Sequence, residues 1–269
     1  MPRDLESEKA TLQGMAPLTK EGEGDSSSPP EHDMPLYRLP STFLDERFRK
    51  MKELHPYCLL LNKDDLDDCD WLEHAAFDPQ EAASREKIEY RLRTCGELCS
   101  GIYSSVPSSA KGKIGQLLSS RDFPRIDTTG TERKRVLLGH IIATKHSSHL
   151  VTDEAMDFPK DWRDKYELNP SSGTGHHEDG QTVCLHSLCV HPDFHDRGLG
   201  RVLLTAWTQR IRDSGIAQRV ALICRERYIG FYENAGFTKI GESKCQYGGG
   251  GWYDMVMEFS DPGFDDSEY

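Results

Sequence analysis

The sequence predicts an α/β fold built on a mixed β-sheet. Apolar runs typical of strands alternate along the chain with stretches whose apolar residues recur at helical spacing. The clearest strand is RVLLGHIIAT at 135–144, which is continuously apolar as in a sheet covered on both faces. The clearest larger unit spans 183–215, where VCLHSLCV leads through a glycine-containing turn into a helix that Gly215 can end.

The other elements follow from the same rules. YCLLLN predicts the first strand, and Leu66, Cys69, Leu72 and Ala76 recur at helical spacing just after it. The stretches 106–132 and 145–181 are polar and are expected to be loops. We expect strands at 57–62, 101–105, 135–144, 183–190, 219–224 and 252–259, and helices after 65, at 81–95, after 200 and at 227–237.

One domain is expected between two tails. Residues 1–35 include GEGDSSSPPEHD and few large apolar groups, so they cannot bury enough surface to offset the entropy of ordering. Residues 261–269 end in an acidic stretch of the same kind. The sequence therefore predicts a disordered tail, a domain at 36–260 and an acidic tail.

The bulk composition excludes several classes of function. The net charge of −12 has the wrong sign for a general binder of nucleic acid or anionic membranes. No apolar run approaches 18 residues, and the N-terminus lacks the apolar core of a signal peptide. We therefore expect a cytoplasmic protein, monomeric, with no nucleic-acid or membrane partner. An acidic field suits a cationic amine substrate, and equally suits simple solubility.

The eight cysteines are expected to be reduced, mostly as small buried hydrophobic residues. Cys95 and Cys99 stand four apart and could share a helix face, but no second pair of metal ligands matches them. The sequence predicts no metal.

The turn HDRGLGR has the composition of a phosphate-binding loop. Gly198 and Gly200 allow an anion to approach bare backbone, and the amides at a helix N-terminus point at such an anion. Arg197 and Arg201 can add charge-assisted contacts. The alternative is a tight turn without a ligand. The third glycine of a dinucleotide fingerprint and the lysine of a nucleotide P-loop are both missing.

A second unit makes the pattern specific. LHSLCVHPDFHDRGLGRVLL followed by FYENAGF resembles the acetyl-CoA-binding motifs of the GNAT superfamily, whose turn reads Gln/Arg-x-x-Gly-x-Gly/Ala. The combination most resembles arylalkylamine (serotonin) N-acetyltransferases of the non-vertebrate, fungal type, and LEHAAF, ASREKIEYRL and CGELCSGIY are similar to their N-terminal region. This resemblance implies a GNAT fold, with a mixed, mostly antiparallel sheet flanked by helices. It implies acetyl-CoA as cosubstrate, held by Leu188, Cys189, Val190, Asp196, Arg197, Gly198, Leu199, Gly200 and Arg201.

The sequence departs from the family pattern at three places. His195 takes the position usually held by Gln or Arg at the start of the turn. Of the two histidines that vertebrate members carry on the central strand, the first is replaced by Cys184 and the second is His186. The vertebrate Cys-Pro-Leu substrate element is missing, and 81–83 aligns there.

His186 is the candidate general base. An alkylamine has a pKa near 10.4, so roughly one molecule in a few thousand is neutral at pH 7, and only that form attacks a thioester. A histidine of ordinary pKa, about 6.5, suits a base at neutral pH. Strand period two would place Cys184, His186, Leu188 and Val190 on one face. The alternatives are a buried histidine satisfied by the backbone, and a Cys184–His186 nucleophile pair.

The remaining candidates come partly from the resemblance and partly from residue type. Tyr232 matches the family tyrosine that gives a proton to the leaving thiolate, and the alternative role is aromatic packing. Phe77, Trp252 and Tyr253 are candidates for the wall of an amine pocket, and the alternative is core packing. Ile223 matches a family position near the substrate. The acidic run 64–73 either attracts a cationic substrate or forms a solvated helix face.

These observations predict an acetyl-CoA-dependent N-acetyltransferase acting on a small primary amine, by direct attack in a ternary complex. Arylalkylamines such as serotonin or tryptamine, and polyamines, are the expected substrates. The alternatives are a peptide or protein N-acetyltransferase and a non-catalytic, CoA-binding regulatory module.

Overall fold

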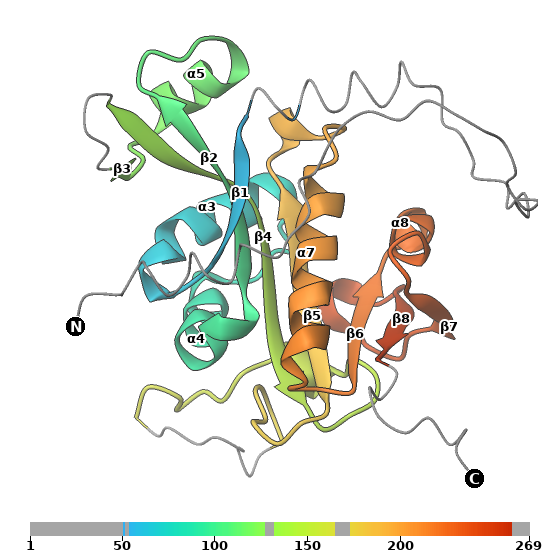
Figure 1. Ribbon diagram of the computed structural model, residues 1–269. Helices are drawn as coiled ribbons and strands as arrows, with labels where there is room; N and C mark the ends of the chain where they lie inside the picture. Colours follow the sequence, from blue (N-terminus) through green and yellow to red (C-terminus); the bar gives the residue numbers. More distant parts are fainter. Residues whose placement is uncertain (1–50, 52–53, 127–131, 165–172, 260–269) are drawn as a thin grey trace, which may run out of the picture. The chain divides into compact units, whose positions relative to one another are not determined.

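A computed structural model of the chain describes residues 51, 54–126, 132–164 and 173–259 (Figure 1). These residues belong to one compact unit, Pro40–Tyr269. The predicted tails at 1–35 and 261–269 lie outside the described residues, so the domain limits at 36 and 260 stay predictions.

Strands and helices alternate in the order expected for an α/β chain. The strands are β1 Pro56–Leu60, β2 Ser100–Pro107, β3 Arg125–Ile126, β4 Arg133–His146, β5 Thr182–Val190, β6 Arg219–Cys224, β7 Thr238–Glu242 and β8 Tyr253–Glu258. The helices are α3 Leu66–Ala76, α4 Arg85–Cys95, α5 Gly112–Ser120, α6 Asp153–Met156, α7 Leu199–Ser214 and α8 Ile229–Glu233.

The strands form one mixed sheet in the order β1-β2-β4-β5-β6-β8-β7, with β3 paired to β4. Neighbouring strands are antiparallel except β5 and β6, which are parallel. The predicted architecture, a mixed, mostly antiparallel sheet flanked by helices, is confirmed.

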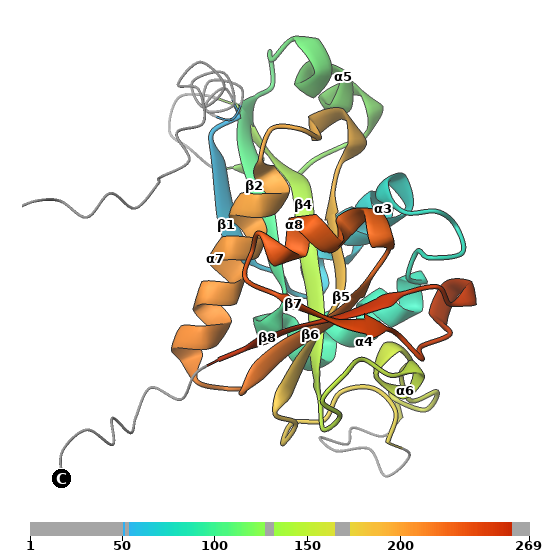
Figure 2. The ribbon, with the colours of Figure 1, turned by 90° about the vertical axis from the view of Figure 1, so that its right-hand side faces the viewer.

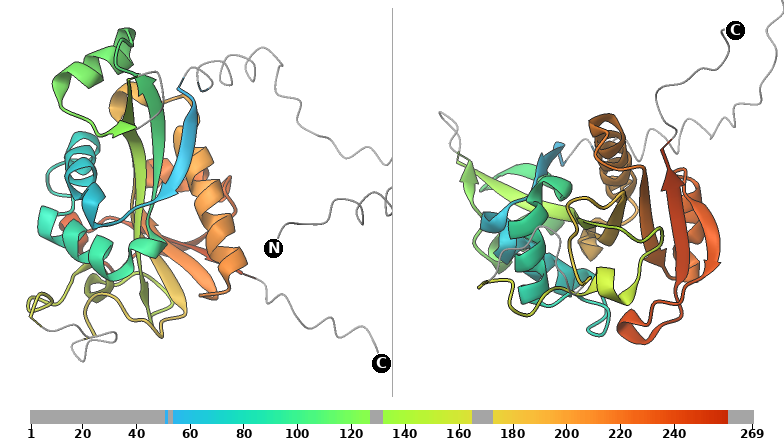
Figure 3. Two further views of the ribbon diagram at one scale, coloured as in Figure 1. Left: turned by 60° about the vertical axis from the view of Figure 1, so that its left-hand side comes forward. Right: turned by 90° about the horizontal axis from the view of Figure 1, so that it is seen from below.

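Helices cover both faces of this sheet. Figure 3 shows α3 and α4 on one side of the strands and α7 on the other. The largest core cluster joins α7 to the sheet through Leu203, Trp207 and Ile211, all at most 1% exposed. A second cluster joins α3 and α4 to the opposite face through Leu72, Ile88 and other buried residues.

The parallel pair β5–β6 is short. Its register runs from Thr182–Arg219 to Leu185–Leu222, although β5 continues to Val190. In Figure 2 the strands β7 and β8 run across the direction of β4, as the twist of the sheet carries its two halves apart. The second half of β5 therefore has a free edge on the side of β6.

Three elements differ from the sequence prediction because tertiary contacts decide them. The expected loop 106–132 contains α5, which packs Leu117 into the core despite two glycines in the helix. The expected loop 145–181 contains the short helix α6, capped by the side chain of Thr152. β7 has a mostly exposed sequence without alternation, and it forms as an edge strand by pairing with β8.

Two predicted helices are shorter than expected. The helix expected at 81–95 begins at Arg85, because the hydroxyl of Ser84 accepts a hydrogen bond from the Lys87 amide at 3.3 Å and caps it. The helix expected at 227–237 is α-helical only over Ile229–Glu233, and Gly236 follows it with a φ of 96°.

The cysteines agree with their prediction: all eight are free, and seven are buried. Among the helices in the described part of the chain, none has the length and apolarity needed to cross a bilayer.

Candidate active site

A cavity of about 560 Å³ lies where β5 and β6 separate. Its wall comes from β5, the start of α7, the end of β6, α8, the segment after α3 and the hairpin before β8. Twelve of the thirteen predicted site residues line it: Phe77, His186, Leu188, Cys189, Val190, Asp196, Gly198, Leu199, Gly200, Arg201, Ile223 and Tyr232. Arg197 is not among the lining residues, and its guanidinium lies over the ring of Phe194, 5.4 Å from the centroid.

The predicted phosphate turn presents bare backbone to this cavity. Gly198 is the N-cap of α7 with a φ of 80°, and no side chain caps the helix. The first amides of an α-helix lack partners within the helix. A Cβ placed on Gly200 would meet only Val190 and Phe231, at 3.6 and 4.0 Å. The protein itself therefore leaves this position open, and an anion can approach the amides of Leu199, Gly200 and Arg201.

The free edge of β5 adds further amides. The His191 amide donates to the Leu138 carbonyl on β4 at 2.8 Å. Because backbone groups alternate in direction along an antiparallel strand, the amides of Leu188 and Val190 point away from β4. They face the side from which β6 has separated, and both residues line the cavity.

His195, which replaces the usual Gln or Arg, has a structural role. Its Nε2 lies 2.8 Å from the Val190 carbonyl, which can only accept, so Nε2 carries the proton. This bond ties the start of the turn to the end of β5.

His186 lines the cavity with both ring nitrogens engaged. Its Nε2 lies 2.7 Å from the Thr144 hydroxyl and its Nδ1 lies 3.1 Å from the Met156 sulfur. Burial holds the pKa of His186 well below its usual value, and the charges of Arg91 and Lys87 lower it further, as do His146 and His176. The expectation of an ordinary histidine pKa is therefore wrong: His186 is a neutral, weak base.

The expectation that Cys184, His186, Leu188 and Val190 share one face is also wrong. The ladder pairs Ile142 with Ser187 and Ala143 with Leu185, so β5 bulges at His186. Cys184 packs in the small cluster with Met156, whereas Leu188 and Val190 pack against the large core cluster.

A Cys184–His186 nucleophile pair has no support either. His186 bonds to Thr144 and Met156, and burial raises the pKa of the Cys184 thiol to about 12. At that pKa the thiolate is absent at neutral pH.

Tyr232 reaches the same cavity from α8. Its ring packs edge-on against Phe231 and Phe237, at centroid distances of 5.1 and 5.6 Å. Burial raises the pKa of its phenol above the usual value, and Cys224 and Tyr228 add to the rise. The phenol is therefore protonated across the physiological range and can donate. The ring packs against its neighbours while its hydroxyl keeps its proton, so aromatic packing does not exclude the predicted proton donation.

The far wall is partly aromatic and carries an ion pair. Tyr247 and Trp252 line the cavity with Phe77. Arg225 binds Glu81 with its Nη2 2.6 Å from Oε1, and its guanidinium stacks on Trp252, 3.7 Å from the ring centroid. Glu81 lies outside the helix that was predicted at 81–95. Its ion pair with Arg225 joins the segment after α3 to the opposite wall of the cavity.

Glu73 is the one member of the acidic run 64–73 that lines the cavity. Its Oε2 accepts hydrogen bonds from Ser187 Oγ at 2.6 Å and His140 Nε2 at 2.9 Å, and the Ala83 amide binds Oε1. Burial alone would raise the pKa of Glu73, but these hydrogen bonds outweigh it and hold the pKa below its usual value. A fixed negative charge therefore stands at the cavity wall.

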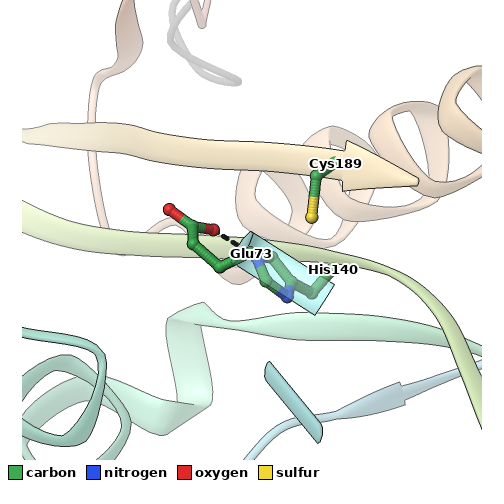
Figure 4. Close-up of side chains that lie close together, drawn as sticks. All are labelled: Glu73, His140 and Cys189. Carbon is green, nitrogen blue, oxygen red and sulfur yellow. Dashed lines mark hydrogen bonds and ion pairs between the residues drawn. The ribbon is translucent and has the colours of Figure 1, made fainter. Parts of the chain in front are cut away.

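The same residue belongs to a group with metal-ligand chemistry (Figure 4). Figure 4 shows the Glu73 carboxylate directed at the His140 ring, with the Cys189 sulfur pointing from β5 toward the same ring. The three possible ligand atoms lie within 4.8 Å of one another, and such a donor set suits zinc. Hydrogen bonds already occupy the carboxylate, however, so the group is explained without an ion. The absence of a metal stays a prediction.

Several of these residues escape sequence reasoning. Met156 belongs to a stretch expected to be a loop, and Arg225 carries no local signal because its partner Glu81 lies 144 residues away. Glu73 was predicted only as one member of the acidic run 64–73, and the sequence did not distinguish it from the others.

The chain is similar in sequence to known acetyltransferases over part of its length. Residues 167–259 match the family model described as "Acetyltransferase (GNAT) domain". The serotonin N-acetyltransferase of Mesocricetus auratus is 36% identical over 78 residues, which are 29% of this chain and 38% of that protein. The human serotonin N-acetyltransferase is 33% identical over the same shares. The match thus spans little more than a third of the curated relatives' length.

Solved structures give the fold. The loading GNATL domain of CurA from Lyngbya majuscula superposes with a TM-score of 0.50 at 11% identity, over 76% of this chain and 98% of that one. A GphF GNAT-like decarboxylase in complex with isobutyryl-CoA also gives 0.50, at 14% identity, over 76% of this chain and all of that one. At such identities the likeness is one of fold.

Proposed function

We propose that this chain, which has the GNAT fold and a GNAT acetyltransferase domain, transfers an acetyl group from acetyl-CoA to a small primary amine. One observation carries the proposal. The uncapped amides that begin α7, the free edge of β5, a neutral imidazole and a protonated phenol all meet in one cavity.

The cavity suits coenzyme A in two respects. The open backbone at Gly198–Arg201 matches a pyrophosphate, which needs closely spaced N–H donors rather than bulky side chains. The amide of Val190 matches a polar group of an extended pantetheine arm. GphF, a protein of the same fold, is described in complex with isobutyryl-CoA, which supports an acyl-CoA ligand here.

The chemistry follows from the groups at the strand opening. The amine nitrogen attacks the thioester carbon, and an amide of the free β5 edge, such as that of Leu188, stabilises the oxyanion. His186 takes the proton from the nitrogen once the C–N bond has formed, when that proton is more acidic than in the free ammonium ion. The C–S bond then breaks, and Tyr232 gives its proton to the departing thiolate.

The wall opposite β5 supports an amine with an apolar or aromatic body. Phe77, Tyr247, Trp252 and Ile223 supply apolar surface. Glu73 supplies negative charge, whereas the charge of Glu81 is paired with Arg225. The partial similarity to serotonin N-acetyltransferases supports an arylalkylamine. For polyamines, the support comes only from the negative charge at the cavity wall. A cytoplasmic location and a monomeric state stay predictions.

A CoA-release assay over aryl, polyamine and peptide amines tests the proposal. We expect release with small primary amines, and higher kcat/KM for these than for peptides. Preference for peptides would support the peptide N-acetyltransferase. Binding of acetyl-CoA without transfer to any amine would support the non-catalytic module.

A further inference from the structure

The geometry points to Thr144 as a positioning residue for His186, with Met156 as a movable cover on the catalytic nitrogen. This inference rests on the proposed function, because it describes how the base is held. Neither residue carries a sequence signal for such a role.

The bulge in β5 creates the contact. Thr144 pairs directly with Cys184, and the next residues of the ladder leave His186 without a partner. Residues directly opposite each other project to the same face, and the bulge turns the following side chain. The imidazole therefore reaches the Thr144 hydroxyl at 2.7 Å.

The two nitrogens of the ring have different surroundings. Thr144 is 1% exposed and is not part of the cavity wall, so Nε2 points into the protein. Met156 lines the cavity beside Nδ1. Nδ1 is therefore the nitrogen that a substrate can reach.

Met156 can uncover Nδ1 without a backbone change. Its carbonyl is fixed by a hydrogen bond from Arg91 Nη2 at 2.9 Å, whereas its side chain is long and unbranched. A thioether accepts but does not donate, so in the covered state Nδ1 carries the proton and Nε2 accepts from Thr144.

A hydroxyl can reverse its role, and this makes the arrangement useful. When Met156 swings away, the Nδ1 proton passes to water in the cavity, and Nε2 takes up the Thr144 hydroxyl proton, which water replaces. Thr144 then accepts from Nε2–H, and Nδ1 presents a lone pair to the amine. The ring keeps its anchor in both tautomers. Without the Thr144 hydroxyl the His186 imidazole would lose this orientation. A catalytic base is less efficient when no third group orients it.

The test combines kinetics with the tautomer of His186. The variants are Thr144→Val, which removes the hydroxyl at similar shape, Thr144→Ser, which keeps it, and Met156→Leu, which removes the sulfur. Thr208→Val is the matched control, since Thr208 is a buried threonine whose hydroxyl bonds to carbonyls of its own helix. NMR with ¹⁵N-labelled histidine reports the tautomer, and His186→Gln assigns the signal.

We expect Thr144→Val to lower kcat roughly tenfold to hundredfold, a share of the ~10²–10⁴ that a positioned base contributes, with the amine KM unchanged. Thr144→Ser restores kcat, and Thr208→Val leaves it unchanged. In the wild type we expect the Nδ1–H tautomer, and in Met156→Leu a shift toward Nε2–H.

Wild-type kcat in Thr144→Val would overturn the positioning role. If Thr144→Val fails to fold, the NMR spectra of the wild type and of Met156→Leu decide the question. The inference is overturned if His186 in the resting wild type is the Nε2–H tautomer, or if Met156→Leu shows no shift of the tautomer. Should the wild type transfer acetyl to no amine, the proposed function fails, while the tautomer measurement still reports separately on the contacts of the ring.

Discussion

Leu185 of β5 and Leu222 of β6 form the last pair in the register of the parallel β5–β6 ladder. β5 continues for five more residues, to Val190, without β6 beside it in that register. The opening that results holds the cavity, and the predictions below concern the groups that surround it.

Substitution of the two glycines in the turn should have different effects, one on stability and the other on ligand binding. Gly198 has a φ of 80°, so Gly198→Ala should lower the free energy of unfolding by about 1–2 kcal/mol. Gly200→Val should change stability less, because its Cβ meets Val190 at an ordinary 3.6 Å. Gly200→Val should instead weaken CoA binding, since the added methyls stand where the anion approaches. Thermal unfolding measures the change in stability, and calorimetry measures the change in CoA affinity. Equal CoA affinity in Gly200→Val and the wild type would contradict the assignment of this turn as the phosphate-binding site.

Replacement of His186 should act on kcat. His186→Gln keeps hydrogen-bonding capacity but cannot take a proton, so kcat should fall roughly 10²-fold or more. Because the pKa of His186 lies well below its usual value, wild-type kcat should show no inflection near pH 6.5 from this group. Steady-state rates between pH 6 and 9 measure both, and full activity of His186→Gln over that range would exclude the base.

Removal of the Tyr232 hydroxyl should slow thiolate departure. Tyr232→Phe keeps the ring packed against Phe231 and Phe237, so stability should change little while kcat falls about tenfold to hundredfold. Since the pKa of Tyr232 is raised above its usual value, the wild type should lose no activity up to pH 9 through ionisation of this phenol. An unchanged kcat in Tyr232→Phe would leave the residue a packing role only.

The stability of the fold should depend on pH through His186. Its pKa in the folded state lies below the unfolded value of about 6.5, so folding favours the neutral form. The contribution is complete above pH 6.5 and is lost as the pH falls toward the folded pKa, by at most about 1.4 kcal/mol per pH unit. His186→Gln should flatten this slope in urea unfolding at pH 5 to 7. An identical slope in both proteins would contradict the neutral state of the ring.

The sequence predicted the elements with strong periodicity. β4, β5, β6 and α7 carry continuous apolar runs or an apolar helix face, and their burial follows the pattern. α5 and β7 carry weak patterns, and contacts with distant parts of the chain decide them. A single-sequence pattern contains no information on those contacts.

The same limit applies to the site. The family motifs predicted ten of the lining residues, because these lie in two contiguous stretches of characteristic spacing. Ile223 was predicted from a single matching family position, and Phe77 as an aromatic residue that could line an amine pocket. The motifs could not predict the bulge at His186, which depends on how β4 pairs with β5. Thr144, Met156 and Arg225 act through that pairing or through contacts across the cavity, so no local signal marks them.

Isothermal titration calorimetry of the full chain with acetyl-CoA tests the central claim most directly. If the amides at the start of α7 and along the free edge of β5 hold the cosubstrate, one molecule should bind per chain, and Gly200→Val should bind it more weakly. Absence of any binding heat at acetyl-CoA concentrations up to about 1 mM, the upper end of ordinary KM values, would contradict the assignment of this cavity.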